Sequence, residues 1–116
     1  MKKRFRLTRS NDFRRVRRSG KSYAHPLVVL YALKSGQPGV RVGVTAGLTV
    51  GNAVRRNRSK RLLREAMRTY LPQVVPGVDM MLIARSALAD SNLQQTVEAL
   101  FNLLKRADLL APSHDD

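Results

Sequence analysis

The order of apolar and polar positions predicts a mixed sheet of about four strands. Residues 27–33, LVVLYAL, are apolar at both parities, which predicts a strand covered on both faces. Residues 40–45 alternate valine with arginine, glycine and threonine, which predicts a half-buried strand. Because only the turn sequence SGQPG at residues 35–39 separates these strands, we expect them to pair as an antiparallel hairpin. Residues 78–84 are again apolar on both faces and suit a central strand.

The first part of the chain predicts a short helix and then an extended segment. Residues 11–19 follow Ser10, whose hydroxyl suits an N-cap, and they stop at Gly20. Phe13 lies on the one apolar side of this helix, where it serves either as a core anchor or as a platform for stacking bases. The residues between Gly20 and Pro26 form a short extended piece, because proline is tolerated at a sheet edge or a strand start.

A final helix is predicted near the C-terminus. Its apolar residues recur with helical spacing at Leu93, Val97, Leu100, Phe101 and Leu104. Ser91 and Gln94 have the spacing of a capping box at its start. We assign the aromatic rings of Tyr70 and Phe101 to the core.

These elements predict an α+β fold, an α/β sandwich with one mixed central sheet and three helices in the order α-β-β-(β)-α-β-α. We expect residues 1–109 to form a single domain and residues 110–116 to form a disordered acidic tail. The chain has no cysteine, which excludes disulfides and fits a reducing compartment. No apolar run approaches the roughly 20 residues that span a bilayer, so we expect a soluble cytoplasmic protein without a membrane partner.

The charge of the chain changes this picture from a fold to a function class. The formal net charge is +14, and it is concentrated in two stretches. Residues 1–21 carry ten basic side chains and one acid, and residues 52–68 carry seven and one. Such concentration is typical of a protein that binds a polyanion, because neutralising phosphates releases counterions.

The second basic stretch predicts a helix that runs from an Asn52 N-cap to Pro72. At about 100° per residue, one sector holds Asn57, Lys60, Arg61, Arg64 and Arg68, and the opposite one holds Ser59, Leu62, Leu63, Ala66 and Tyr70. An ordinary solvated face would mix its signs, whereas here only Arg61 and Glu65 have i,i+4 pairing. Arg55 and Arg58 do not fit the stripe. The stripe favours phosphate binding.

The sequence lacks the patterns of an independent nuclease. Metal-dependent cleavage needs clustered carboxylates, and acid–base cleavage needs placed histidines. Asp79, Asp90 and Glu98 are isolated in the sequence, and His25 and His114 lie far apart without supporting motifs. We therefore predict no catalytic residue and no metal ligand in the protein.

The segment GNAVRRNRSKRLLREAMR at residues 51–68 closely resembles the protein subunit of bacterial ribonuclease P. Arg56, Asn57 and Arg58 match the RNR motif of that family, and Lys60, Arg61 and Arg64 match its further basic positions. The opening KKRFRLTRSNDF, the LYAL and RVGVT strands and the IAR segment extend the resemblance over nearly the whole domain.

The resemblance implies a left-handed βαβ crossover around the basic helix, and a subunit that assists endonucleolytic removal of the 5′ leader of precursor tRNA. Catalysis would belong to a large RNA that holds Mg²⁺ together with the substrate, and the protein would be a monomer within the ribonucleoprotein. The catalytic-RNA contacts would be Arg56, Asn57, Arg58, Lys60, Arg61, Arg64 and Arg68. A cleft between the first helix and the sheet would take the leader, with Phe13, Val16, Arg17, Tyr31 and Arg85 as its contacts.

Two departures and two alternatives accompany this interpretation. Many relatives have a second aromatic residue where this chain has Arg17, and lysines where it has Gly47 and Leu48. A structural RNA-binding protein of ribosomal type would be equally basic and equally free of an active site. A self-sufficient endonuclease is disfavoured, because no carboxylate cluster is visible.

Overall fold

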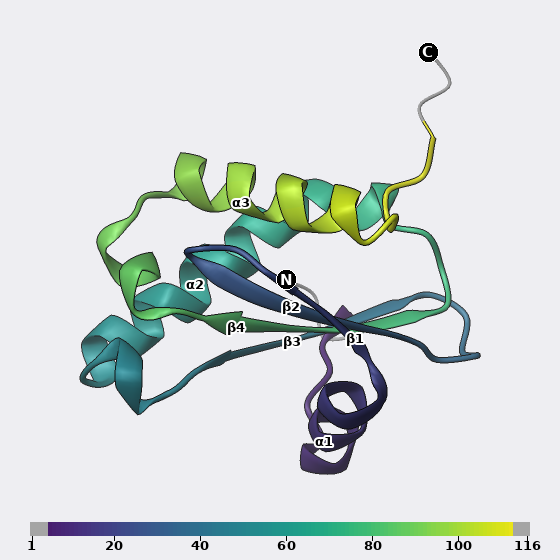
Figure 1. Ribbon diagram of the computed structural model, residues 1–116, viewed down its shortest axis with the longest axis horizontal. Helices are drawn as coiled ribbons and strands as arrows, with labels where there is room; N and C mark the ends of the chain where they lie inside the picture. Colours follow the sequence, from purple (N-terminus) through teal and green to yellow (C-terminus); the bar gives the residue numbers. More distant parts are fainter. Residues whose placement is uncertain (1–4, 113–116) are drawn as a thin grey trace.

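The computed structural model describes residues 5–112 as a three-layer α+β fold, with α2 and α3 on one face of a four-stranded sheet and α1 on the other (Figure 1). The helices are α1 (Ser10–Ser19), α2 (Ala53–Tyr70) and α3 (Leu93–Arg106), the strands are β1 (Lys21–Ala24), β2 (Val28–Lys34), β3 (Val40–Ala46) and β4 (Val78–Ala84), and the short 3-10 helices are η2 (Leu48–Val50), η3 (Leu71–Gln73) and η4 (Ser86–Asp90). The predicted fold class is confirmed.

The strand order is β1-β2-β4-β3, so the predicted hairpin of β2 with β3 is wrong. β4 lies between them, antiparallel to β2 and parallel to β3, and α2 is the crossover from β3 to β4. The central place of β4 is confirmed, and it explains the error. β4 is the most continuously buried strand, and the middle of the sheet covers both of its faces and both of its edges.

The turn at residues 35–39 bridges over the start of β4. The backbone N–H of Ser35 donates to the carbonyl of Gly77 at 2.9 Å, and the N–H of Gly77 donates to the carbonyl of Gly39 at 2.7 Å. The five-residue turn therefore joins two strands that are not neighbours in the sheet, because β4 lies between them. The local sequence alone does not indicate this arrangement.

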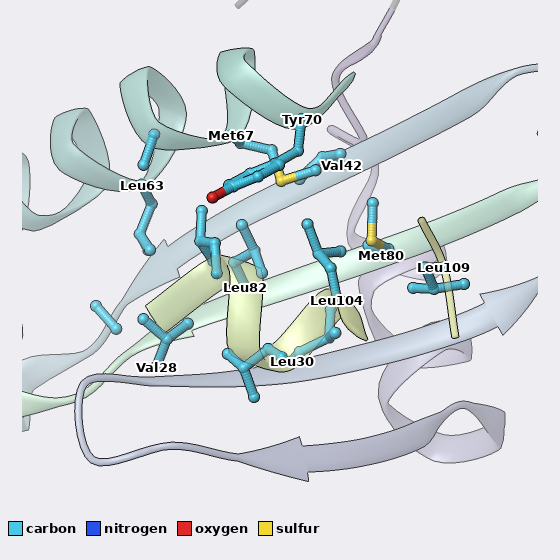
Figure 2. Packing of buried hydrophobic residues seen from close by; sticks show 14 of the residues in the cluster. Val28, Leu30, Val42, Leu63, Met67, Tyr70, Met80, Leu82, Leu104 and Leu109 are labelled. Carbon is cyan, nitrogen blue, oxygen red and sulfur yellow. The ribbon is translucent and has the colours of Figure 1, made fainter. Parts of the chain in front are cut away.

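The main core lies between the sheet and the pair α2 and α3 (Figure 2). Its largest fully buried residues include Leu30, Leu63, Met67, Met80, Leu82, Leu100, Leu103 and Leu104. Tyr70 is 8 % exposed, and its hydroxyl donates to the carbonyl of Val97 at 3.0 Å, so its core assignment is confirmed. The apolar side of α2 includes Met67, which the predicted sector omitted, while Leu62 is only half-buried.

The core assignment of Phe101 is wrong. Its side chain is 44 % exposed, its ring centroid lies 6.2 Å from that of Tyr70, and the ammonium of Lys105 lies 5.5 Å from its ring centroid. The capping box is formed by Asn92 and Gln95, one residue later than predicted. The later start and the burial of residues 99, 100, 103 and 104 place position 101 at the margin of the helix's apolar face.

Of the two other predicted N-caps, one is present in the structure and one is not. The Asn52 N-cap is confirmed, because its Oδ1 accepts the N–H of Arg55 at 3.0 Å. The Ser10 N-cap is wrong, since Ser10 is the first residue of α1 and Arg9 occupies the cap without a side-chain hydrogen bond. The start of α1 therefore depends on tertiary contacts more than on a local cap.

A smaller apolar cluster holds α1 against the sheet. Leu7, Val16 and Met81 are buried, and Phe13, Tyr31, Leu33 and Ile83 pack around them half-buried. A Cβ at Gly43 would lie 2.6 Å from the ring of Phe13. Glycine at this position of β3 therefore lets the Phe13 ring approach the sheet.

Asp79 adds a buried charge to this contact. Its side chain is 1 % exposed and faces two arginines: Arg41 donates to it from Nε at 3.0 Å and from Nη2 at 2.8 Å, and Arg15 of α1 donates through Nη2. Burial alone would raise the pKa of Asp79, but the hydrogen bonds from Arg41 and Arg15 outweigh it and hold the pKa below its usual value. Asp12 also accepts from Arg15, at 3.3 Å.

At the C-terminal end, the N–H of Ala111 donates to the carbonyl of Gln73 at 2.7 Å, and Leu110 bridges to Val74. Residues 113–116, most of the predicted disordered tail, lie outside the described residues, as do residues 1–4. Within residues 5–112, no helix is both long and apolar enough to cross a membrane.

We predict that Asp79→Asn lowers the free energy of unfolding by about 3 kcal/mol at pH 7, the low end for breaking a buried ion pair, because both arginines keep contact with solvent. Because the folded-state pKa is depressed, this contribution is present above the unfolded pKa near 3.8 and is lost as the pH falls through the folded value. Urea unfolding between pH 7 and pH 3 measures both effects. Glu65→Gln, in an exposed pair, is the control and should barely move the midpoint. Equal midpoints for Asp79→Asn and the unmodified protein would contradict the prediction.

Candidate nucleic-acid interface

The polar side of α2 presents cations without acidic partners. Asn57 and Arg61 are exposed, Lys60 and Arg64 are half-buried, and these four side chains line a shallow hollow together with Val54. We call these four the α2 polar face. Among the described residues, no acid lies within ion-pair distance of Lys60, Arg61 or Arg64. Such a face can bind phosphates through charge and hydrogen bonds.

Two other predicted contacts on α2 are less free. Arg68 pairs with Glu65 at 3.2 Å, although Arg61 is also spaced to pair with Glu65. Positions i,i+3 and i,i+4 are both neighbours on a helix, and Glu65 takes the C-terminal one. Arg56 is half-buried, and its Nε has no hydrogen-bond partner among the described residues.

Arg55 and Arg58 lie outside the stripe, as the sequence indicated, and both contact η4. Arg55 forms a two-point ion pair with Asp90 at 2.9 and 3.1 Å. Arg58, predicted as an RNA contact, donates from Nε to the carbonyl of Ala89 at 2.9 Å and from Nη2 to the carbonyl of Ser91 at 2.8 Å. The sequence offered no signal for these contacts, because η4 lies about thirty residues further along the chain.

Of the other predicted contacts, Phe13, Val16 and Tyr31 meet where α1 packs on the sheet, while Arg17 is exposed on α1 and Arg85 is exposed directly after β4. We define the α1-side surface as the half-buried Phe13, Tyr31 and Ile83 with the exposed Arg17 and Arg85. Ile83 was missed, although its parity with Asp79 and Met81 along β4 could have indicated it. Val16 is 0 % exposed, so it supports this surface from beneath. The surface joins apolar rings to cations, which suits single-stranded nucleic acid.

His25 has a structural role in a turn. Nδ1 of His25, in the turn between β1 and β2, accepts the N–H of Leu27 at 3.1 Å, and burial, aided by the charge of Arg106, lowers the pKa of the ring. His114 lies outside the described residues. Among residues 5–112, no group of three or more histidine, aspartate or glutamate side chains could hold a metal ion.

Comparison with known proteins gives one consistent family. The family model described as Ribonuclease P matches residues 1–108. The ribonuclease P protein component of Exiguobacterium sp. is 41 % identical over 107 residues, covering 92 % of this chain and 93 % of that protein. That of Clostridioides difficile is 38 % identical over 104 residues, covering 89 % and 91 %.

Solved structures agree with the sequence relatives. The RNase P protein of Staphylococcus aureus superposes with a TM-score of 0.82 at 29 % identity, covering 91 % of this chain and 97 % of that one. The RNase P protein of Thermotoga maritima superposes with a TM-score of 0.77 at 32 % identity, covering 87 % and 96 %. Sequence, fold and the basic helix therefore agree, and this chain belongs to the ribonuclease P protein family, as the protein component of that tRNA-processing endoribonuclease.

Proposed function

We propose that the protein binds two RNAs on two faces, the catalytic RNA on the α2 polar face and the 5′ leader of precursor tRNA on the α1-side surface. The observation that carries the proposal is the unpaired positive charge of Lys60, Arg61 and Arg64 along one side of α2. Like charges at this spacing repel one another, and the phosphates of an RNA backbone would neutralise them.

The proposed RNA contacts of α2 differ in how many partners each side chain already has within the protein. Asn57, Lys60, Arg61 and Arg64 reach the RNA directly in this proposal, and Arg56 reaches it at the margin. Arg68 competes with its own pair to Glu65, and Arg58 has two of its donors on backbone carbonyls. We therefore assign the largest contributions to Arg61 and Arg64.

The α1-side surface suits a leader of varied sequence. Aromatic rings stack on any base, and cations follow the backbone without reading the sequence. Tyr31 and Phe13 would supply the stacking, with Arg17 and Arg85 on phosphates. In this proposal Phe13 would fill both of the roles left open by the sequence, since its ring packs over Gly43 and is only half-buried.

The chemical step would belong to the RNA. Magnesium prefers several free oxygen ligands, and the carboxylates of Asp79 and Asp90 already bind arginines. We therefore place Mg²⁺ on the catalytic RNA and the substrate, and we place the protein as a monomer in a cytoplasmic ribonucleoprotein. Family membership disfavours the alternative of a ribosomal-type protein.

We predict that Arg64→Ala weakens binding to a bacterial ribonuclease P RNA and lowers the magnitude of the salt slope by about 0.7 to 0.9, because one phosphate contact is lost. Affinity measured at several salt concentrations gives the slope. Lys105→Ala is the matched control, since Lys105 is an exposed cation on α3 over the ring of Phe101. An unchanged slope for Arg64→Ala, or an equal drop for Lys105→Ala, would argue against the α2 polar face.

We predict that Tyr31→Leu weakens the holoenzyme's binding of precursor tRNA by about 1 kcal/mol, the low end for one stacked base, and leaves mature tRNA unaffected. Single-turnover cleavage at saturating enzyme should stay near the unmodified rate, because stacking made equally in the ground and transition states changes only affinity.

Tyr23→Leu is the control for this substitution. Tyr23 of β1 is half-buried on the opposite face of the sheet, where it packs against the main core. Precursor binding should be unchanged in this variant. A Tyr31→Leu protein that binds precursor normally but cleaves it a hundredfold more slowly at saturation would contradict the proposal.

A further inference from the structure

The short helix η4 is held from outside by two arginines of α2. Arg55 donates to both carboxylate oxygens of Asp90, at 2.9 and 3.1 Å, and to the carbonyl of Ser86 at 3.3 Å. Arg58 donates to the carbonyls of Ala89 at 2.9 Å and Ser91 at 2.8 Å. The two guanidiniums thus contact η4 at its first residue, at its last two and just beyond its end.

Arg85 belongs to the same hydrogen-bonded unit. It is the residue directly before η4, and its carbonyl accepts the N–H of Leu88 at 3.0 Å, the first hydrogen bond of the 3-10 turn. Its own N–H donates to the carbonyl of Leu27 at 3.0 Å. The backbone of Arg85 is therefore fixed by the residue before β2 on one side and by η4 on the other, while its side chain is exposed.

We propose that Arg55, Arg58 and Asp90 are positioning residues that act through η4 to aim Arg85 at the leader of precursor tRNA. This inference rests on the proposed leader contact of Arg85. It gives the basic residues of α2 two different roles. The cations of the α2 polar face bind RNA, whereas the two arginines outside the stripe hold the structure that presents a different RNA contact.

The geometry favours positioning over a direct contact for these two arginines. A planar guanidinium with five donors can bind several acceptors at once, which a lysine ammonium cannot match in geometry. Arg55 uses this on a carboxylate and on the carbonyls of Ser86 and Val50, the last at 2.9 Å from its Nε. A side chain whose donors are already used in this way has little left for a phosphate.

Asp90 distinguishes positioning from simple charge. It is an exposed acid next to the most basic helix of a protein with a net charge of +14, so its charge alone works against binding a polyanion. If Asp90 contributed only charge, its removal would tighten RNA binding. If it holds η4 for Arg85, its removal weakens the discrimination of precursor from mature tRNA, which is an effect of opposite sign.

The test uses the holoenzyme reconstituted with a bacterial ribonuclease P RNA, and it measures the ratio of affinities for precursor and mature tRNA. Arg85→Gln should lower this ratio by about tenfold, as expected for one charge-assisted hydrogen bond. Asp90→Asn should lower it by roughly threefold to tenfold, because an amide offers one acceptor and turns a donor toward Arg55. Arg58→Gln should behave in the same way.

The combined Asp90→Asn and Arg85→Gln variant should lose no more than Arg85→Gln alone, since a residue that acts through another shows no effect once that residue is gone. Asp108→Asn is the charge-matched control: Asp108 is exposed, and asparagine tolerates its φ of 57°. It should leave the ratio unchanged.

Additive losses in the combined variant, or an Asp90→Asn protein with an unchanged or raised ratio, would overturn the positioning role while leaving the leader contact of Arg85 in place. An Arg85→Gln protein with normal discrimination would overturn the leader contact itself, and the positioning role with it.

Discussion

The attachment of α1 to the sheet depends on the buried carboxylate of Asp79. Helix α1 carries four arginines and one aspartate, and such a short, self-repelling helix is marginal by itself. Asp79 forms ion pairs with Arg15 of α1 and Arg41 of β3 beside the apolar cluster that holds α1 against the sheet. Because one partner is buried, this pair is less screened than a surface pair. Phe13 packs on the same face of the sheet as Tyr31 only while α1 stays in this place.

The sheet then separates the arginines of α1 from the basic residues of α2. β4 is buried along almost its whole length, and α1 and α2 lie on opposite faces of the sheet that it centres (Figure 1). One face carries the large core under α2 and α3, and the other carries the small cluster under α1. In the proposed function, this arrangement lets a chain of 116 residues use a different face of the sheet for each RNA.

Sequence patterns predicted the features that local periodicity encodes. The apolar side of α2, the Asn52 cap and the central β4 are of this kind, and the RNR helix was sufficient to indicate the family. Features that depend on residues far away in the sequence were predicted wrongly or missed. β4, the strand between β2 and β3, lies about forty residues after β2 in the sequence. Neither the hydrogen bonds of Arg58 to η4 nor the burial of Asp79 has a local sequence signature. The core assignment of Phe101 was wrong for a smaller reason, because a shift of one position moves a residue from the buried face of a helix to its margin.

The central claim is that α2 and the α1-side surface contact different RNAs. The most direct measurement is photo-crosslinking in a holoenzyme assembled with precursor tRNA, with a photoreactive benzoylphenylalanine placed at Asn57 in one protein and at Tyr31 in another. Both positions have accessible side chains, one on each surface. The account predicts that Asn57 crosslinks to the catalytic RNA and Tyr31 to leader nucleotides of the precursor. Crosslinks from both positions to the same RNA would contradict it.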